Sequence, residues 1–469
     1  MRAFPPPSIA SPCGPGEHFG AACEARRARG GSAGDGGKPD AEHAARAPRS
    51  SPSRHDGAVR RGLSRAPAAS DPQVSAAHPL AAIVAAQVLV QVGAFFLPAL
   101  LPAFIARWSL SATEAGWLVG AFFAAYVPTV PVLVALTDRV PARRVYLAGA
   151  GLTALSHLGM AVAADGFWGA LLLRAVAGVG WAACYMPGLK MIADRLEGAA
   201  QSRAVSWHAL GVGIAGAASF AVAGLLDAIA GPALVFMFGA VTAAAAFGTV
   251  ALVIRPGGAR SGPKVPVAEL LDFRPVFRNR PALAWIAGYS VHTWEMAALR
   301  AWGVTFLALI MTRSDAPDWL PGPNALFSAA GLLGIAISVS GNELAQRFGR
   351  ARIVAGAMLA GAVLSVATGL SFGLWPPIAI CCVLAWNAAI YLDSAALTAG
   401  TVAAADKARR GATMGLHSMC GYAGGFIGPL GVGLALDVAG RDTVMGWALA
   451  FGHLAPVVLV GLLVLRRLA

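Results

Sequence analysis

The sequence contains few charged residues for its length. Of its 469 residues, 13% are Asp, Glu, Lys or Arg, whereas 57% are hydrophobic. A soluble chain carries roughly twice that fraction of charge, because charged side chains cover its surface. The excess of apolar side chains must therefore face something other than water, and we expect a lipid bilayer as the surrounding medium.

Signatures of enzyme and metal chemistry are also scarce. The six cysteines show no CxxC or Cys/His spacing, and neither a Walker lysine loop nor an HExxH motif occurs. These absences argue against a zinc site, a disulfide framework and a nucleotide-driven pump. We therefore expect no metal, no cofactor and no enzymatic activity.

The net charge of +13 raises nucleic acid as an alternative partner. The Lys and Arg residues, however, lie in short gaps between apolar runs and not on one polar face. Membrane proteins place cytoplasmic charge in such gaps. The sequence therefore predicts a lipid bilayer, and not nucleic acid, as the partner.

Residues 1–78 differ in composition from the rest of the chain. They are rich in Pro, Gly, Ala, Ser and Arg and show no apolar periodicity. Such a segment buries too little apolar surface to fold alone, which predicts a disordered basic cytoplasmic tail. A competing hypothesis is that the start is misassigned and that translation begins near Val74, just before the first apolar run.

Twelve apolar segments follow residue 78, each long enough to cross a bilayer core of about 30 Å. They are predicted at 80–105, 113–136, 145–164, 167–192, 205–229, 232–254, 283–311, 325–345, 352–373, 376–399, 411–436 and 444–465. The predicted fold class is an all-α polytopic membrane protein with twelve transmembrane helices. We expect an N-terminal six-helix bundle at 79–254, a central cytoplasmic loop at 255–282 and a C-terminal six-helix bundle at 283–469.

The basic residues predict the orientation of these spans. If the tail is inside, the inner loops and the C-terminus hold 19 Lys and Arg residues. The outer loops then hold three, namely Arg107, Arg313 and Arg441. This asymmetry follows the positive-inside rule and predicts two cytoplasmic termini in a multi-pass protein of the cell (inner) membrane.

The two halves of the chain resemble each other at a nearly constant spacing. The matched pairs, 208 or 209 residues apart, are Arg139/Arg347, Arg144/Arg352, His208/His417 and Gly216/Gly425. A steady offset across separate segments indicates duplication, which is common in transporter folds. The loop between the halves ends in ELLDFRPVFRNR, which fits either a short amphipathic helix on the membrane surface or a plain linker.

Three segments carry a resemblance to a known family. The segment Asp138-Arg139…Arg143-Arg144 resembles the loop motif G-x-L-a-D-R-x-G-R-R of the major facilitator superfamily, and Glu343-Leu-Ala-Gln-Arg347-Phe-Gly349-Arg350 resembles its second copy. Arg174-Ala-Val-Ala-Gly178-Val-Gly180 is similar to the family pattern in span four. The sequence departs from the loop motif in several positions. Val134 and Asn342 occupy the glycine positions, Pro141-Ala142 interrupts the first copy, and Gln346 replaces the acidic residue of the second copy.

The resemblance covers about residues 80–466 and implies a fold and a conformational gate. The fold is that of two pseudo-symmetric six-helix bundles, the MFS fold. In the gate, Asp138 would lie against the N-terminal end of a facing helix and pair with an arginine on the inner side. The gate residues implied are Asp138, Arg139, Arg144, Arg347 and Arg350. The competing interpretation of Asp138 is a solvated loop carboxylate.

Ionisable groups within the predicted spans are few, and a charge inside a membrane is costly enough to suggest a function. We predict that six residues line a central substrate cavity: Gln87, Gln91, Arg174, His292, Glu295 and Arg300. Glu295 and His292, which share one helix face, are also predicted to carry a coupling proton. The alternative is a set of polar clamps between helices that bind no ligand.

The two arginines favour an anionic solute, because guanidinium groups suit carboxylates and phosphates. The predicted function is secondary active transport of a small organic or inorganic anion by alternating access, as a monomer and as a proton-coupled symporter. A drug/proton efflux antiporter is one alternative, although span five lacks the proline of the family's antiporter signature. A non-transporting sensor or partner protein is another, and uptake in proteoliposomes would separate these functions.

Overall fold

The computed structural model describes residues 72–137, 139–256, 272–314 and 316–468. Most of the predicted tail, residues 1–71, lies outside these ranges. So do Asp138 of the predicted gate and residues 257–271 of the central loop. Across the described ranges all regular secondary structure is helical, so the all-α fold class is confirmed.

The first half comprises α1 (Pro72–Gln91), α2 (Phe96–Trp108), α3 (Ala112–Leu136), α4 (Ala142–Val162), α5 (Phe167–Ala193) and α6 (Gly198–Val253). The short α8 (Arg274–Arg278) lies in the described end of the central loop, as part of the predicted amphipathic segment. The second half comprises α9 (Arg280–Arg313), α10 (Pro323–Phe348), α11 (Arg350–Leu370), η1 (Ser371–Gly373), α12 (Pro376–Ala404), η2 (Lys407–Arg409), α13 (Arg410–Ala439), α14 (Val444–Gly452) and α15 (Leu454–Leu468).

Eleven helical stretches in the described chain are long and apolar enough to cross a membrane. One of them, α6, has 56 residues and contains two of the predicted spans. Its helical geometry is interrupted at Ala230 and Gly231, where Gly231 has a φ of 76°. This left-handed conformation suits glycine, and Pro232 then starts the next helical segment. With this interruption the described helices account for all twelve predicted spans.

Prolines break the first and the last span, which hydropathy did not predict. A helical proline clashes with the carbonyl four residues earlier and has no N–H to donate. Pro98 therefore disfavours regular helical geometry at Ala94, which lies in the gap between α1 and α2. Pro456 has the same relation to Gly452, where α14 ends.

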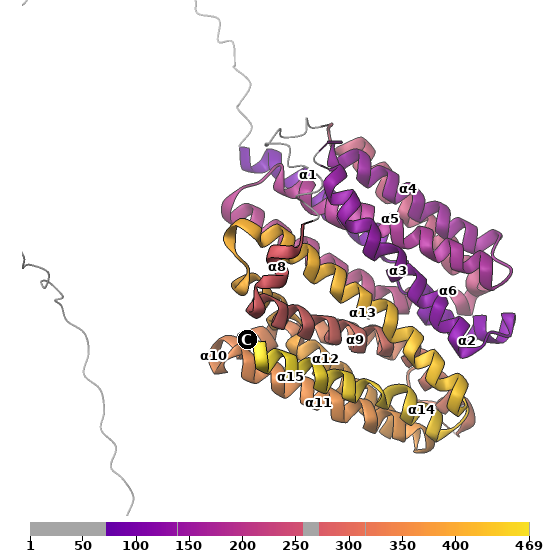
Figure 1. Cartoon of the computed structure of the whole chain (residues 1–469). Coiled ribbons are helices and arrows are strands. Elements are labelled where there is room, and N and C mark those ends of the chain that lie inside the picture. The colour runs from indigo at the N-terminus through magenta and orange to yellow at the C-terminus, as the bar shows by residue number, and fades with distance from the viewer. Residues whose placement is uncertain (1–71, 138, 257–271, 315, 469) are drawn as a thin grey trace, which may run out of the picture. The chain divides into compact units, whose positions relative to one another are not determined.

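The two halves form two groups of helices, with α1–α6 on one side and α9–α15 on the other (Figure 1). The helices α4 and α11 both have 21 residues, and their start and end positions each differ by 208. This is the offset of the matched arginines in the sequence. The duplication predicted from the sequence therefore extends to the lengths and positions of helices.

The helical bundle has two unlike ends. We call the end where α1 begins and α15 finishes the basic end, because Arg139, Arg347 and Arg466 lie there. The opposite end, with the turns between α2 and α3 and between α13 and α14, is called the distal end.

Contacts at the distal end join the two halves. The Asp437 carboxylate of α13 accepts the backbone N–H groups of Ala112 (2.8 Å) and Thr113 (2.7 Å) at the start of α3. Nearby, a Cβ on Gly116 would lie 2.7 Å from the carbonyl oxygen of Pro429, so α3 and α13 approach at backbone distance. A helix N-terminus favours a carboxylate, which adds electrostatic attraction to this close packing.

Candidate functional site: a central cavity with two arginines

A small enclosed cavity lies between the two halves, near the middle of the bundle. Its volume is about 30 Å³, which is room for about two water molecules. The first half contributes Gln91, Ala94, Phe95, Pro98, Val119, Phe122, Phe123, Arg174, Trp181, Val212 and Gly216, and α9 contributes Ala297, Arg300 and Ala301. In this conformation a solute larger than water fits only if side chains or the halves move apart.

Arg174 on α5 is the most buried cation of the cavity. It is 2% exposed, and its Nε donates a long hydrogen bond of 3.4 Å to the Leu118 carbonyl on α3. Its guanidinium carbon lies 4.8 Å from the centre of the Phe122 ring. The ring face and one carbonyl offset part of the cost of this charge, but no described carboxylate forms an ion pair with it.

Arg300 reaches the cavity from α9 in the second half. It donates a hydrogen bond to the Tyr391 hydroxyl on α12. Its guanidinium carbon lies 5.0 Å from the centre of the Phe95 ring, across the boundary between the halves. Like Arg174, it has no carboxylate partner within the described ranges. The cavity therefore contains two cations from opposite halves and no described anion that pairs with them.

The break between α1 and α2 forms part of the cavity wall. The Phe95 N–H, released from helical bonding, donates to the Ser219 hydroxyl on α6 (3.0 Å). Gln91 is 2% exposed, and neither its amide oxygen nor its amide nitrogen finds a hydrogen-bond partner in the described chain. Discontinuous helices at the midplane are a recurring way to present polar groups to a solute.

Glu295 and His292 lie off the cavity, inside the second half. The Glu295 carboxylate accepts a hydrogen bond of 2.5 Å from the Trp386 indole on α12. His292 Nδ1 lies 2.7 Å from the Asp393 carboxylate, also on α12. Together with the pair Arg300–Tyr391, these contacts form what we call the polar seam between α9 and α12. Only its Arg300 end lines the cavity.

Gln87 also lies off the cavity, inside the first half. A Cβ on Gly188 would meet both His208 Nε2 (2.8 Å) and Gln87 Oε1 (3.3 Å), which places these two side chains together. Of the six residues predicted for the cavity, the structure thus brings Gln91, Arg174 and Arg300 to it. It places Gln87, His292 and Glu295 between helices of a single half.

The predicted gate residues lie at the basic end. Arg139, Arg144 and Arg347 are exposed, and Arg350 is half-buried. Among the residues that the structure describes, no ion pair joins a gate residue of one half to the other half. Asp138 lies outside those residues. The gate therefore stays a prediction.

Several residues of the cavity and the polar seam were not predicted from the sequence. They are Phe95, Phe122, Trp181, Trp386 and Tyr391, together with Asp393, which was recognisable as an ionisable group in span ten. Aromatic residues are common throughout membrane spans, so their type and spacing did not distinguish cavity walls from lipid-facing surface.

One string in the sequence matches the G-x-S-x-G pattern of hydrolase nucleophiles, namely Gly369-Leu-Ser371-Phe-Gly373. In hydrolases that pattern lies on a turn between a strand and a helix. Here it lies at the end of α11 and in η1, and the buried Ser371 hydroxyl donates to the Thr368 carbonyl (2.7 Å). This geometry gives Ser371 a structural role.

The comparisons with known proteins agree with this architecture. The model of the Major Facilitator Superfamily matches residues 83–429, most of the chain. The chain belongs to the Major Facilitator Superfamily. It is therefore a multi-pass membrane protein with the architecture of a secondary transporter of small molecules, as the motifs predicted. No curated protein matches the sequence significantly.

Three solved structures illustrate the shared fold. The nucleoside transporter NupG is 13% identical with a TM-score of 0.66, over 82% of this chain and 98% of that one. A bacterial homolog of the human lysosomal transporter Spinster, in an inward-facing and occupied conformation, is 16% identical with a TM-score of 0.64, over 85% and 96%. A POT family transporter in complex with a thioalcohol-conjugated peptide is 12% identical with a TM-score of 0.67, over 83% and 96%. At these identities the likeness shows the fold and not the solute.

Proposed function

We propose that this transporter carries a small organic anion across the bilayer by alternating access. The observation behind the proposal is that Arg174 and Arg300, from opposite halves, line one enclosed cavity without a described carboxylate partner. Two such charges are costly in an apolar interior. A bound carboxylate would supply the missing negative charge and would contact both halves at once.

The walls of the cavity favour an organic over an inorganic anion. Phe95, Phe122, Phe123 and Trp181 surround the guanidinium groups with aromatic surface. Apolar walls with a few convergent polar groups are typical of sites for organic molecules. A flat carboxylate such as benzoate combines both features and is the probe that we choose.

The charge asymmetry supports an orientation with the basic end in the cytoplasm of a cell (inner) membrane protein. Both termini then lie inside, and the contacts of Asp437 and Gly116 hold α3 and α13 together on the outer side. One chain contains both halves and the cavity between them, so a monomer is sufficient for transport.

We further propose that the polar seam couples transport to protons. Glu295, His292 and Asp393 are buried, and they lie on the same two helices, α9 and α12, as Arg300 and Tyr391. A proton gained or lost by the Glu295 carboxyl would change the charge beside α12 and so bias the packing of the second half. This coupling would make the protein a proton-linked symporter.

Counterflow in proteoliposomes tests the solute. Vesicles preloaded with unlabelled benzoate should accumulate external [¹⁴C]benzoate through the wild type, whereas vesicles preloaded with neutral uridine should not accumulate uridine. Arg174→Gln and Arg300→Gln should each reduce benzoate exchange by at least about tenfold, since each removes a charged contact in a low-dielectric site. Arg107→Gln is the matched control, because Arg107 is exposed and off the cavity. Exchange of uridine but not benzoate, or full exchange by Arg174→Gln, would overturn the proposal.

A further inference from the structure

A second and larger pocket lies at the distal end, at the interface between the two halves. Its volume is about 520 Å³. One wall is the end of α2 with Pro102 and Ile105, and the facing wall is the end of α9 with Thr305 and Leu309. The turn between α13 and α14 forms the third side through Arg441 and Asp442. The pocket is large enough for a small organic molecule in the described conformation.

This distal pocket lies directly outside the central cavity. Pro98 and Ala301 line the central cavity, and Pro102 and Thr305 line the distal pocket. Each pair is four residues apart on the same helix, which is about one helical turn, or roughly 6 Å. A solute that moves between the outer solution and the central cavity along the interface of the two halves therefore passes through the distal pocket.

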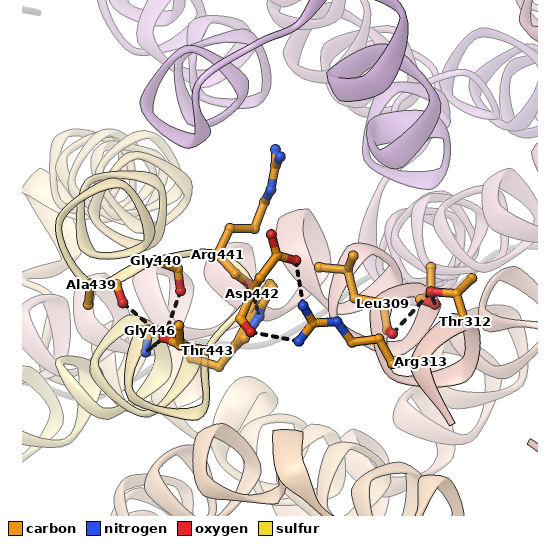
Figure 2. Close-up of polar contacts among 11 residues, drawn as sticks. Leu309, Thr312, Arg313, Ala439, Gly440, Arg441, Asp442, Thr443 and Gly446 are labelled. Carbon is orange, nitrogen blue, oxygen red and sulfur yellow. Dashed lines mark hydrogen bonds and ion pairs between the residues drawn. The ribbon is translucent and has the colours of Figure 1, made fainter. Parts of the chain in front are cut away.

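The turn between α13 and α14 holds Arg441 in a defined position. Arg313 donates to the Asp442 carbonyl (2.6 Å) and pairs with its carboxylate (3.1 Å). The Trp447 indole donates to the Arg441 carbonyl (2.8 Å). Figure 2 shows the Arg441 side chain directed away from the pair of Arg313 and Asp442, towards the ribbon of the first half.

The charge and hydrogen-bonding groups of the pocket match an anion. The Asp442 carboxylate is engaged by Arg313, and Arg441 forms no ion pair within the part of the chain that the structure describes. Thr305 is 2% exposed, and its hydroxyl has no hydrogen-bond partner there. Arg441 and Thr305 thus both line the pocket, together with the polar Ser109, Thr312 and Asp442 and with apolar residues of α2 and α9.

We propose that the distal pocket is an outer binding site where Arg441 and Thr305 hold the organic anion before it reaches the central cavity. The inference rests on the proposed function for its choice of ligand and on the orientation for its outer side. The carboxylate would contact the guanidinium of Arg441 and, once the Thr305 side chain rotates its buried hydroxyl into the pocket, that hydroxyl as well. The apolar body would lie against Pro102, Ile105 and Leu309. Occupancy of this site would keep an anion at the outer end of the path before it moves to the central cavity.

Binding of 4-fluorobenzoate to the full-length protein in nanodiscs, followed by ¹⁹F NMR, tests the site. Arg174→Gln removes the central arginine, and binding should persist in this background. Adding Arg441→Gln or Thr305→Val should weaken that remaining affinity by at least about fivefold, the loss expected for one charged or buried hydrogen bond. Arg441→Lys should restore part of it, and neutral 4-fluorobenzyl alcohol should not bind.

Two matched variants complete the experiment in the same background. Arg107→Gln removes an outer arginine that does not line the pocket. Thr249→Val removes a hydroxyl on α6, off the pocket, that donates to the Ala245 carbonyl (2.8 Å). Both should leave the affinity unchanged. If Arg174→Gln alone abolishes binding, or Arg107→Gln weakens it as much as Arg441→Gln does, the outer site is refuted while benzoate exchange still supports the transport proposal. Absence of both binding and exchange in the wild type would overturn both proposals.

Discussion

At the scale of single residues, the environment of Glu295 is unusual for a carboxylate. It is 4% exposed, and the described chain supplies no cation as an ion-pair partner. Its Oε1 accepts the Trp386 indole N–H, and a Cβ on Gly361 would approach that same oxygen to 2.6 Å. The α11 backbone and α12 therefore enclose the carboxyl group. A proton on Glu295 is the simplest way to remove the cost of its charge.

Glu295→Gln keeps the shape of this side chain and removes its proton exchange. We expect the variant to lose uptake driven by a pH gradient and to retain benzoate counterflow, because counterflow needs no net proton movement. The measurement compares both assays in the same proteoliposomes. Trp386→Phe serves as the control, since it removes the hydrogen bond but leaves the carboxyl group and should keep pH-driven uptake. Unchanged pH-driven uptake by Glu295→Gln would remove Glu295 from the coupling mechanism.

At the scale of elements, the contact between α13 and the start of α3 closes the distal end. The Asp437 carboxylate accepts two backbone N–H groups there, which would otherwise lack partners at a helix N-terminus. Favourable charge at a helix N-terminus contributes roughly 0.3–1 kcal/mol. The contact joins segments from different halves, so it must break before this end can open.

Asp437→Asn should weaken the closure of the distal end, because the amide has no charge to interact with the α3 dipole. We expect the Ala112 and Thr113 amides to exchange hydrogen roughly two- to fivefold faster than in the wild type. Hydrogen-exchange mass spectrometry in nanodiscs measures this rate. Asp227→Asn is the matched control, since Asp227 lies near the distal end of the first part of α6 and its carboxylate accepts no hydrogen bond from the described residues. Equal acceleration by both variants would attribute the effect to net charge.

At the scale of the whole molecule, the two halves are joined in the distal part of the bundle, and the charge is concentrated at the other end. The basic end includes the exposed Arg139, Arg144 and Arg347, and the C-terminal helix finishes there with Arg466 and Arg467. In the described part of the chain, α1 begins and α15 finishes on that side.

Reporter fusions test this topology. A reporter at either terminus should report the cytoplasm, and one inserted in the turn at Ser109–Ser111 should report the outside, because the basic end is retained on the inner side. Alkaline phosphatase, active only outside, and a fluorescent protein, fluorescent mainly inside, give opposite signals at each position. Termini on opposite sides of the membrane would contradict the twelve-span fold and the orientation together.

The sequence by itself determined the number of spans and the family, since both depend on properties that act along the chain. A run of apolar residues must be helical in lipid, because each backbone polar group needs an internal partner. The 208-residue offset of the arginine loops likewise predicted the matching positions of α4 and α11, because duplication repeats segments at a fixed spacing along the chain. None of these features depends on the direction in which a particular side chain points.

Only the tertiary structure decided which polar residues meet at the cavity. Glu295 and Arg300 are five residues apart on α9, yet one contacts Trp386 inside the second half and the other reaches the cavity. Gln87 and Gln91 are one turn apart, but the helix breaks directly after Gln91, and only Gln91 lines the cavity. In a span that is apolar on all sides, hydropathy does not tell lipid-facing from partner-facing surface. That distinction arises only when the helices pack against one another.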